Sequence, residues 1–202
     1  MTRQPELVFR TWGGKRAGAG RKRRTNELPH VARPELHSNH PQHVTIRVRP
    51  DVISLRRSKS FAAVKRALKA CREQFGARVC QWAVLGNHLH ILIEAEDRIA
   101  LGRAIKGLNV RLAKELNRLM GRKGRVIADR YHVRALKTPT EVRNALLYLA
   151  QNARKHGFTK SPLPDRYSSW ANVDLIAQPH TWLLRCGFNR AGPVAEMMRA
   201  GP

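Results

Sequence analysis

Two histidines, His88 and His90, stand two residues apart in the apolar run His88-Leu89-His90-Ile91-Leu92-Ile93-Glu94. In a β-strand, residues two apart project from the same face, so both imidazoles point one way and Leu89 and Ile91 the other. Imidazole is a common ligand for divalent metals, and a sheet gives it a rigid platform. The pair predicts a metal site; the alternative is two structural histidines, which is the more common origin of so short a motif.

A second chemical group lies on the last long helix that the sequence predicts. Its core stripe consists of Val142, Ala145, Leu146, Leu149 and Ala153. At 100° per residue, Tyr148 falls about 120° and Asn152 about 80° from the centre of that stripe. Because these two residues are one turn apart, the phenol and the carboxamide share a flank and could address one site. The alternative is an edge-packed aromatic and a polar residue near a helix end.

The elements that must position these groups follow from the spacing of apolar residues. Alternation over 44–48 predicts a strand, and steps of three and four over 61–75 predict a helix. Residues 78–85 and 88–94 predict a hairpin about the turn Gly86-Asn87. A long amphipathic helix is expected over 101–119, ending at Gly121.

A further strand over 125–136 and a helix from Thr138-Pro139-Thr140-Glu141 to Gly157 complete the pattern, since Thr138 can cap and Pro139 suits a first turn. The order β-α-β-β-α-β-α predicts an α+β fold of the ferredoxin-like split βαβ type. We expect an antiparallel sheet with helices over one face.

The composition of the chain indicates which class of partner it binds. The 202 residues include 39 Lys and Arg against 14 Asp and Glu, a formal charge of +25. Charge of this size favours a polyanion, with steep salt dependence, and nucleic acid fits best. We expect no membrane partner, because the chain lacks an apolar run long enough to span a bilayer. The three cysteines are scattered along the chain and form no CxxC pair, so neither a disulfide framework nor a zinc knuckle is indicated.

Three segments are expected along the chain. Residues 1–41 are rich in Gly, Arg and Lys and predict a basic disordered arm, either a nonspecific DNA tether or a solvated leader. Residues 42–157 form the domain, and 158–202 a C-terminal tail that packs a short helix on it. Without a secretory signal, the protein is expected in the bacterial cytoplasm, associated with the nucleoid.

At this point the motifs show a resemblance. The run from Gly86 to Glu94 resembles the His-hydrophobic-His strand of the HUH endonucleases, and Tyr148-Leu149-Ala150-Gln151-Asn152 resembles their tyrosine helix. Between them, Asp129-Arg130-Tyr131-His132 and the segment 138–146 are similar to the REP-associated tyrosine transposases, a branch of the single-tyrosine insertion-sequence transposases. The similarity spans residues 42–157.

The resemblance implies a DNA transposase of HUH fold that nicks and rejoins single-stranded DNA, with Tyr148 as the nucleophile and a 5′-phosphotyrosine intermediate. It implies that His88, His90 and Asn152 bind Mg²⁺ or Mn²⁺. Gln151 is a second candidate for the amide ligand, since many members of the family use Gln, whereas the four-residue step from Tyr148 favours Asn152. The expected substrate is single-stranded or hairpin-forming repeat DNA.

Residues flanking the tyrosine helix are expected to guide the strand. Phosphates would be held by Arg130, Arg134, Arg143, Arg154 and Lys155, and a base would stack on Tyr131 or Trp82. Leu147, on the helix side away from the core stripe, is compatible with a homodimer or with contact to the tail. Two rival functions stay open: a noncatalytic DNA- or RNA-binding module, and a metal-dependent nuclease that uses water in place of tyrosine.

Overall fold

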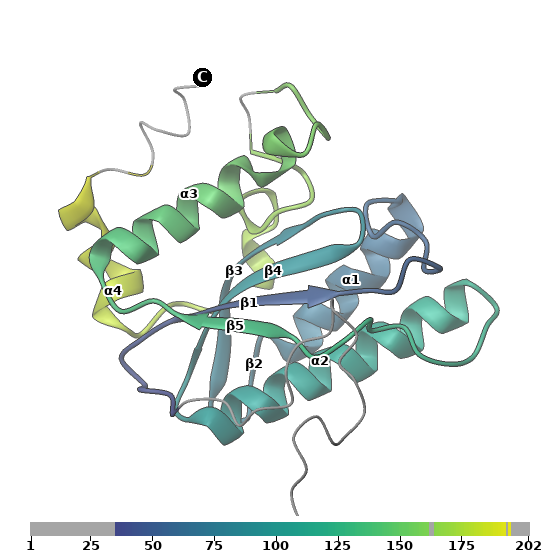
Figure 1. The fold of residues 1–202 in the computed structure, drawn as a ribbon, viewed down its shortest axis with the longest axis horizontal. Helices are drawn as coiled ribbons and strands as arrows, with labels where there is room; N and C mark the ends of the chain where they lie inside the picture. The colour runs from purple at the N-terminus through teal and green to yellow at the C-terminus, as the bar shows by residue number, and fades with distance from the viewer. Residues whose placement is uncertain (1–34, 162–163, 193, 195–202) are drawn as a thin grey trace, which may run out of the picture.

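The protein is an α+β domain built on one antiparallel sheet (Figure 1). The computed structural model describes residues 35–161, 164–192 and 194. The sheet has the order β2-β3-β4-β1-β5, with β4 at its centre and β1 between β4 and β5. The strands are β1 (Gln42–Arg47), β2 (Glu73–Gln74), β3 (Ala77–Val84), β4 (His88–Ala95) and β5 (His132–Ala135). Without the two-residue β2, this is the strand order of the ferredoxin-like split βαβ fold, as predicted.

Helices cover both faces of the sheet, as Figure 1 shows. The two crossover helices, α1 (Ser58–Cys71) and α2 (Arg98–Leu119), pack together on one face, as expected. The third helix, α3 (Pro139–Lys155), lies over the opposite face with the short α4 (Trp182–Arg185), which differs from the expectation that the helices cover one face. The physical reason lies in β4, which is buried along nearly its whole length and therefore needs cover on both sides.

Two hydrophobic cores result, one on each face. Leu89, Ile91 and Ile93 belong to the larger core under α1 and α2. Leu92 belongs to the smaller core under α3, together with Leu146 and Leu149 of that helix. Because successive side chains of β4 point to opposite faces, His88 and His90 lie on the same face as Leu92, toward α3.

The ends of α3 are fixed by local chemistry that the sequence predicted. The Thr138 hydroxyl accepts a hydrogen bond from Glu141 N at 3.2 Å, and the Glu141 carboxylate accepts from Thr138 N at 3.2 Å, which completes a capping box. At the other end Gly157 has φ +71°, a left-handed conformation that ends the helix where expected.

The strand expected over 125–136 is much shorter than predicted. Only His132–Ala135 form β5, and Ile127 makes an isolated bridge with Val48. Between them the chain turns: the Asp129 carboxylate accepts a hydrogen bond from Arg130 N at 2.7 Å, a local contact that competes with strand pairing.

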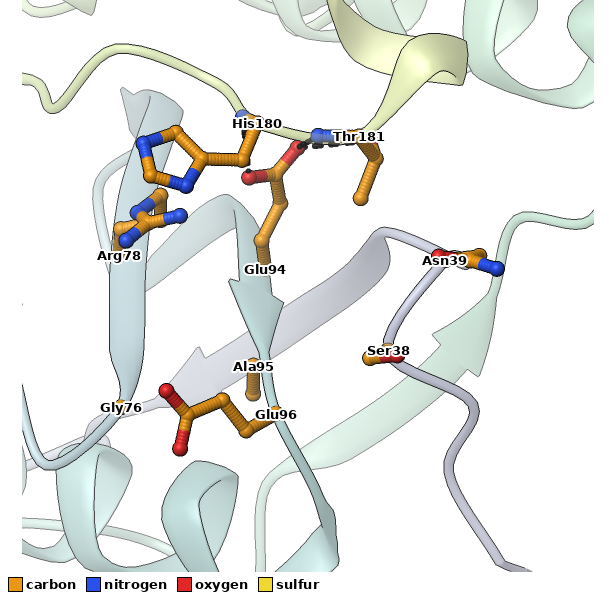
Figure 2. A pocket seen from close by; sticks show the side chains of 9 residues that line it. All are labelled: Ser38, Asn39, Gly76, Arg78, Glu94, Ala95, Glu96, His180 and Thr181. Carbon is orange, nitrogen blue, oxygen red and sulfur yellow. Dashed lines mark hydrogen bonds between the residues drawn. The ribbon is translucent and has the colours of Figure 1, made fainter.

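The described part of the C-terminal segment packs onto the domain. Asp165 forms an ion pair with Arg56 at 2.6 Å, with both side chains about nine-tenths buried. Figure 2 shows Glu94 of β4 reaching up to the loop before α4, where its carboxylate accepts hydrogen bonds from His180 N at 2.7 Å and from Thr181 N at 2.9 Å. Leu183 and Leu184 of α4 then join the smaller core. The basic arm lies, except for residues 35–41, outside the described residues.

Within the described ranges, no helix is both long and apolar enough to cross a membrane.

Candidate active site

The two histidines of β4 sit beneath α3 on a platform shared with β1. In the antiparallel register, Thr45 lies opposite His90 and Arg47 opposite His88, so these four side chains share the face turned toward α3. His90 is only 5% exposed, and the ring centroids of the two histidines are 4.8 Å apart. The predicted common orientation of both imidazoles is present.

Tyr148 of α3 lies directly against this pair. Its hydroxyl oxygen is 3.5 Å from His90 Nε2, and the two rings meet edge to face with centroids 5.1 Å apart. Tyr148 is partly buried, as its position off the core stripe predicted. The structure therefore brings together a helix residue and a strand residue that are 58 positions apart in sequence.

Asn152 lies between two residues of α3 that each contact one of the histidines. Tyr148 precedes it by one turn and stacks on His90, and His156 follows it by one turn, with its ring 5.9 Å from that of His88. Asn152 is 0% exposed, and neither its Oδ1 nor its Nδ2 has a hydrogen-bond partner among the described residues. A buried carboxamide is nearly always paired, so this one calls for a ligand.

Three neighbours that the sequence analysis missed hold the imidazoles in place. His90 Nδ1 is 3.1 Å from His43 Nε2 and 3.1 Å from Thr45 Oγ1, both on β1. His88 Nδ1 is 2.8 Å from Asn87 Oδ1. Both histidines thus contact neighbouring side chains through Nδ1, an arrangement that orients the rings, and His90 Nε2 faces the Tyr148 hydroxyl. Only Thr45 lies in the strand predicted over 44–48, and the register of β1 against β4 that brings both residues to His90 is not fixed by the sequence.

The site keeps its imidazoles uncharged at neutral pH. Burial lowers the pKa of His90 to about 3, with further lowering by the neighbouring histidines and Arg47. Burial likewise lowers the pKa of His88 to about 4, aided by Arg47 and His156, and that of His43 to about 4, aided by His132 and Arg134. A neutral imidazole has the free lone pair that a metal ligand requires.

This donor set fits a divalent cation as two imidazoles and one amide. Across the described chain, no cluster of three or more His, Cys, Asp and Glu side chains is arranged to hold a metal ion. The carboxamide of Asn152, buried and without a partner among the described residues, could supply the oxygen that two histidines alone lack. A set of two imidazole nitrogens and one amide oxygen is compatible with a divalent transition metal such as Mn²⁺ at least as well as with Mg²⁺.

A cavity of about 520 Å³ opens beside Tyr148 on the side of β5. His43, Gln151 and Lys155 contribute to its walls, and Lys155 Nζ is 5.7 Å from the centre of the Tyr148 ring. Gln151 thus borders this open cavity, whereas the adjacent Asn152 is fully buried, and the two candidate amides occupy different environments.

The basic residues expected to hold phosphates divide into two groups. Arg134 borders the cavity next to Tyr148; its side chain is 63% exposed and pairs with Glu141 at 2.9 Å. Lys155 borders the same cavity. Arg143 instead donates to the Gly192 carbonyl oxygen at 3.1 Å, and the partly buried Arg154 is not among the cavity residues.

The two aromatic residues expected to stack a base lie away from the site. Trp82 is 0% exposed and packs on Phe61 in the larger core, so the prediction that it stacks a base is wrong. The alternation of β3 turns its indole toward α1, where nothing outside the domain can reach it. Tyr131 packs against the same core, on the sheet face opposite Tyr148, and Arg130 precedes it in the turn before β5.

Comparison with known proteins bears on the fold. No family model matches the sequence, and no curated protein matches it. Among solved structures, the fold is similar to that of a REP-associated tyrosine transposase bound to a REP hairpin, with a TM-score of 0.58 and 15% identity over 76% of this chain and 93% of that one. A protein from Deinococcus radiodurans R1, provisionally described as a transposase, has a TM-score of only 0.40 at 15% identity, over 68% and 97% of the two chains, and carries no argument.

The first likeness establishes the class of fold: an α+β domain of the type found in tyrosine transposases. The resemblance to the REP-associated branch is thereby confirmed at the level of the fold.

Proposed function

We propose that the protein is a single-tyrosine DNA transposase, which nicks and rejoins single-stranded DNA through a 5′-phosphotyrosine intermediate. The observation that carries the proposal is the approach of the Tyr148 hydroxyl to within 3.5 Å of His90 Nε2, on a platform of buried, neutral imidazoles. A nucleophile must lie beside the group that binds its substrate, and Tyr148 meets this geometric requirement. The shared fold supports the proposal.

His88, His90 and Asn152 are proposed to hold one Mg²⁺ or Mn²⁺ ion. When bound, the ion supplies positive charge that polarises a nonbridging phosphate oxygen and orients phosphorus for attack. All three side chains are neutral, so the charge of the ion is not cancelled by its ligands. Asn87, Thr45 and His43 would act by keeping the two rings oriented.

The covalent step is proposed to fall to Tyr148. Its phenolic oxygen forms a bond to phosphorus while the bond from phosphorus to the 3′ oxygen breaks, and the phenolic proton is transferred overall to the released 3′-hydroxyl. The 5′-phosphate remains on the tyrosine as an ester, so a second 3′-hydroxyl can reverse the step and join new DNA without a nucleotide cofactor.

The substrate is proposed to be hairpin-forming repeat DNA. The fold neighbour was solved with a REP hairpin, and the charge of +25 on this chain suits a nucleic-acid backbone. Arg134 and Lys155, on the wall of the cavity beside Tyr148, are the predicted phosphate contacts that the geometry supports best. Residues 42–157 would carry the catalysis and residues 1–41 would tether the DNA nonspecifically.

The test is a nicking assay on a DNA hairpin with single-stranded extensions, with MnCl₂ and with EDTA. We expect the wild type to nick only with the metal, Tyr148→Phe not to nick, and Tyr131→Phe, altered on the opposite face of the sheet, to nick normally. Nicking that persists in Tyr148→Phe would overturn the tyrosine mechanism in favour of a water-using nuclease. Binding without any nicking by the wild type would favour the noncatalytic module.

A further inference from the structure

An exposed aromatic ring, Phe158, stands at the end of α3 beside the histidine platform. Its position is set by the way the helix ends: Phe158 N–H donates to the Ala153 carbonyl oxygen at 2.8 Å and Gly157 N–H to that of Arg154 at 2.9 Å. With Gly157 at φ +71°, these two bonds form a Schellman motif. The residue after the glycine usually packs back on its helix, yet 46% of Phe158 is exposed.

The ring rests on a rigid support. The Arg56 guanidinium lies 4.6 Å from its centroid, and that guanidinium is itself fixed by two hydrogen bonds to Asp165, at 2.6 and 2.8 Å, and one to the Val84 carbonyl oxygen at 2.8 Å. The tip of the ring also lies beside the turn of the β3–β4 hairpin, because a Cβ added at Gly86 would be 3.4 Å from Phe158 Cζ, which is van der Waals contact. An aromatic residue held this firmly loses little entropy on binding a partner.

The exposed ring borders a cavity of about 360 Å³ that has one wall in common with the candidate active site. His88 and His156 line it on the site's side, Phe158 and Val52 contribute apolar surface, and Asn87 and Ser54 are polar. It lies on the His88 side of the platform, whereas the cavity beside Tyr148 lies on the β5 side. A strand whose phosphate sits at the histidines would therefore place a neighbouring nucleotide at Phe158.

We propose that Phe158 is the stacking platform for one nucleobase next to the scissile phosphate, an inference that rests on the proposed function. Every base has an apolar π-face, so a fixed aromatic ring can bind any of them. The stacking of a base, expected from the sequence for Tyr131 or Trp82, is thus assigned to Phe158, which follows the C-terminus of α3. Phe158 is a positioning residue: it holds a nucleotide beside the phosphate and takes no part in bond making.

The test is equilibrium binding of the full chain to the fluorescently labelled DNA hairpin with single-stranded extensions, by anisotropy in EDTA, where nothing is cleaved. Stacking on an aromatic is worth about 1–3 kcal/mol per base, so Phe158→Leu should weaken binding by about 5- to 150-fold. Phe158→Trp should keep the affinity. The matched control is Phe75→Leu, which alters an equally exposed Phe, 55% exposed, in the turn between β2 and β3 at the far end of the hairpin, and should bind as the wild type does.

A scan with single abasic nucleotides locates the base and does not depend on the folding of any variant. The wild type should lose affinity sharply at one position of the extension, and Phe158→Leu should lose nothing further at that position. Equal losses at every position, or Phe158→Leu binding as tightly as the wild type, would overturn the proposal. Because no nicking is needed, a failure of the tyrosine mechanism leaves this result intact, and a failure of stacking leaves the nicking test intact.

Discussion

Replacing Asn152 by leucine should make the metal-free protein more stable while abolishing its response to metal. The carboxamide is 0% exposed and both of its polar atoms lack a partner among the described residues. An unpaired buried amide costs about 1–3 kcal/mol by mutational estimates. Leucine has a similar volume and no polar atoms, so Asn152→Leu should raise the free energy of unfolding in EDTA by about 1–3 kcal/mol, less any loss from imperfect packing.

Metal should raise the stability of the wild type relative to Asn152→Leu. An ion that binds only the folded state at about 100 times its Kd adds about 2.7 kcal/mol to the free energy of unfolding. The wild type should gain this increment with MnCl₂, and Asn152→Leu should lose most of it, because one of three protein ligands is gone. Urea unfolding followed by circular dichroism, with EDTA and with MnCl₂, measures all four values.

Gln151→Leu is the matched control, since it removes the adjacent amide from the wall of the open cavity. We expect it to keep the stabilisation by Mn²⁺. The reasoning would be refuted if Asn152→Leu were destabilised in EDTA and still gained as much from Mn²⁺ as the wild type. Loss of the Mn²⁺ response in Gln151→Leu alone would identify Gln151 as the amide ligand.

Three further predictions concern the forces that hold the site together. Burial lowers the pKa of His90 to about 3, so as the pH falls below 6.5 this histidine takes up a proton in the unfolded chain before it does so in the folded protein. His90 alone should therefore lower the free energy of unfolding by about 2 kcal/mol at pH 5 relative to pH 8. Urea unfolding of His90→Gln should show a shallower pH dependence than the wild type, and an equal slope would contradict this cause. Asp165→Ala leaves Arg56 buried and unpaired and should cost about 3–5 kcal/mol. Asp51→Ala, which removes an exposed carboxylate paired with Arg49 and Arg122, should cost much less; equal losses in thermal unfolding would argue against burial as the reason. Glu94→Leu leaves the backbone donors before α4 without an acceptor and should cost at least about 1–3 kcal/mol, more than Glu94→Gln; a smaller loss for leucine would show that those donors find other partners.

Much of the fold could be predicted because its local signals agree. The alternation of β1, the turn at Gly86-Asn87 and the capping box of α3 each fix an element independently of the rest of the chain. The boundaries that were missed depend on competition between local contacts, as in the turn at Asp129 that shortens β5. The position of α3 on the second face depends on the burial of β4, which a pattern of alternation alone does not reveal.

The same distinction between local sequence signals and contacts that depend on the fold applies to the site. The position of His88, His90 and Tyr148 in one site was predicted from the resemblance of one strand and one helix to those of the HUH endonucleases, whereas their spacing alone left a structural role open for each. His43 and Thr45 could not be assigned, because their role depends on the register of β1 against β4, which sequence does not fix. Trp82 illustrates the reverse error: an aromatic suited to stacking on a base is equally suited to a core, and only burial decides between the two.

The central claim is tested most directly by trapping the covalent intermediate. The wild-type protein is incubated with the DNA hairpin and MnCl₂, denatured, digested with protease and analysed by mass spectrometry. The account predicts a peptide that carries a nucleotide 5′-phosphate on Tyr148 and is absent from Tyr148→Phe. Cleaved DNA with no adduct, or an adduct on any other residue, would contradict it.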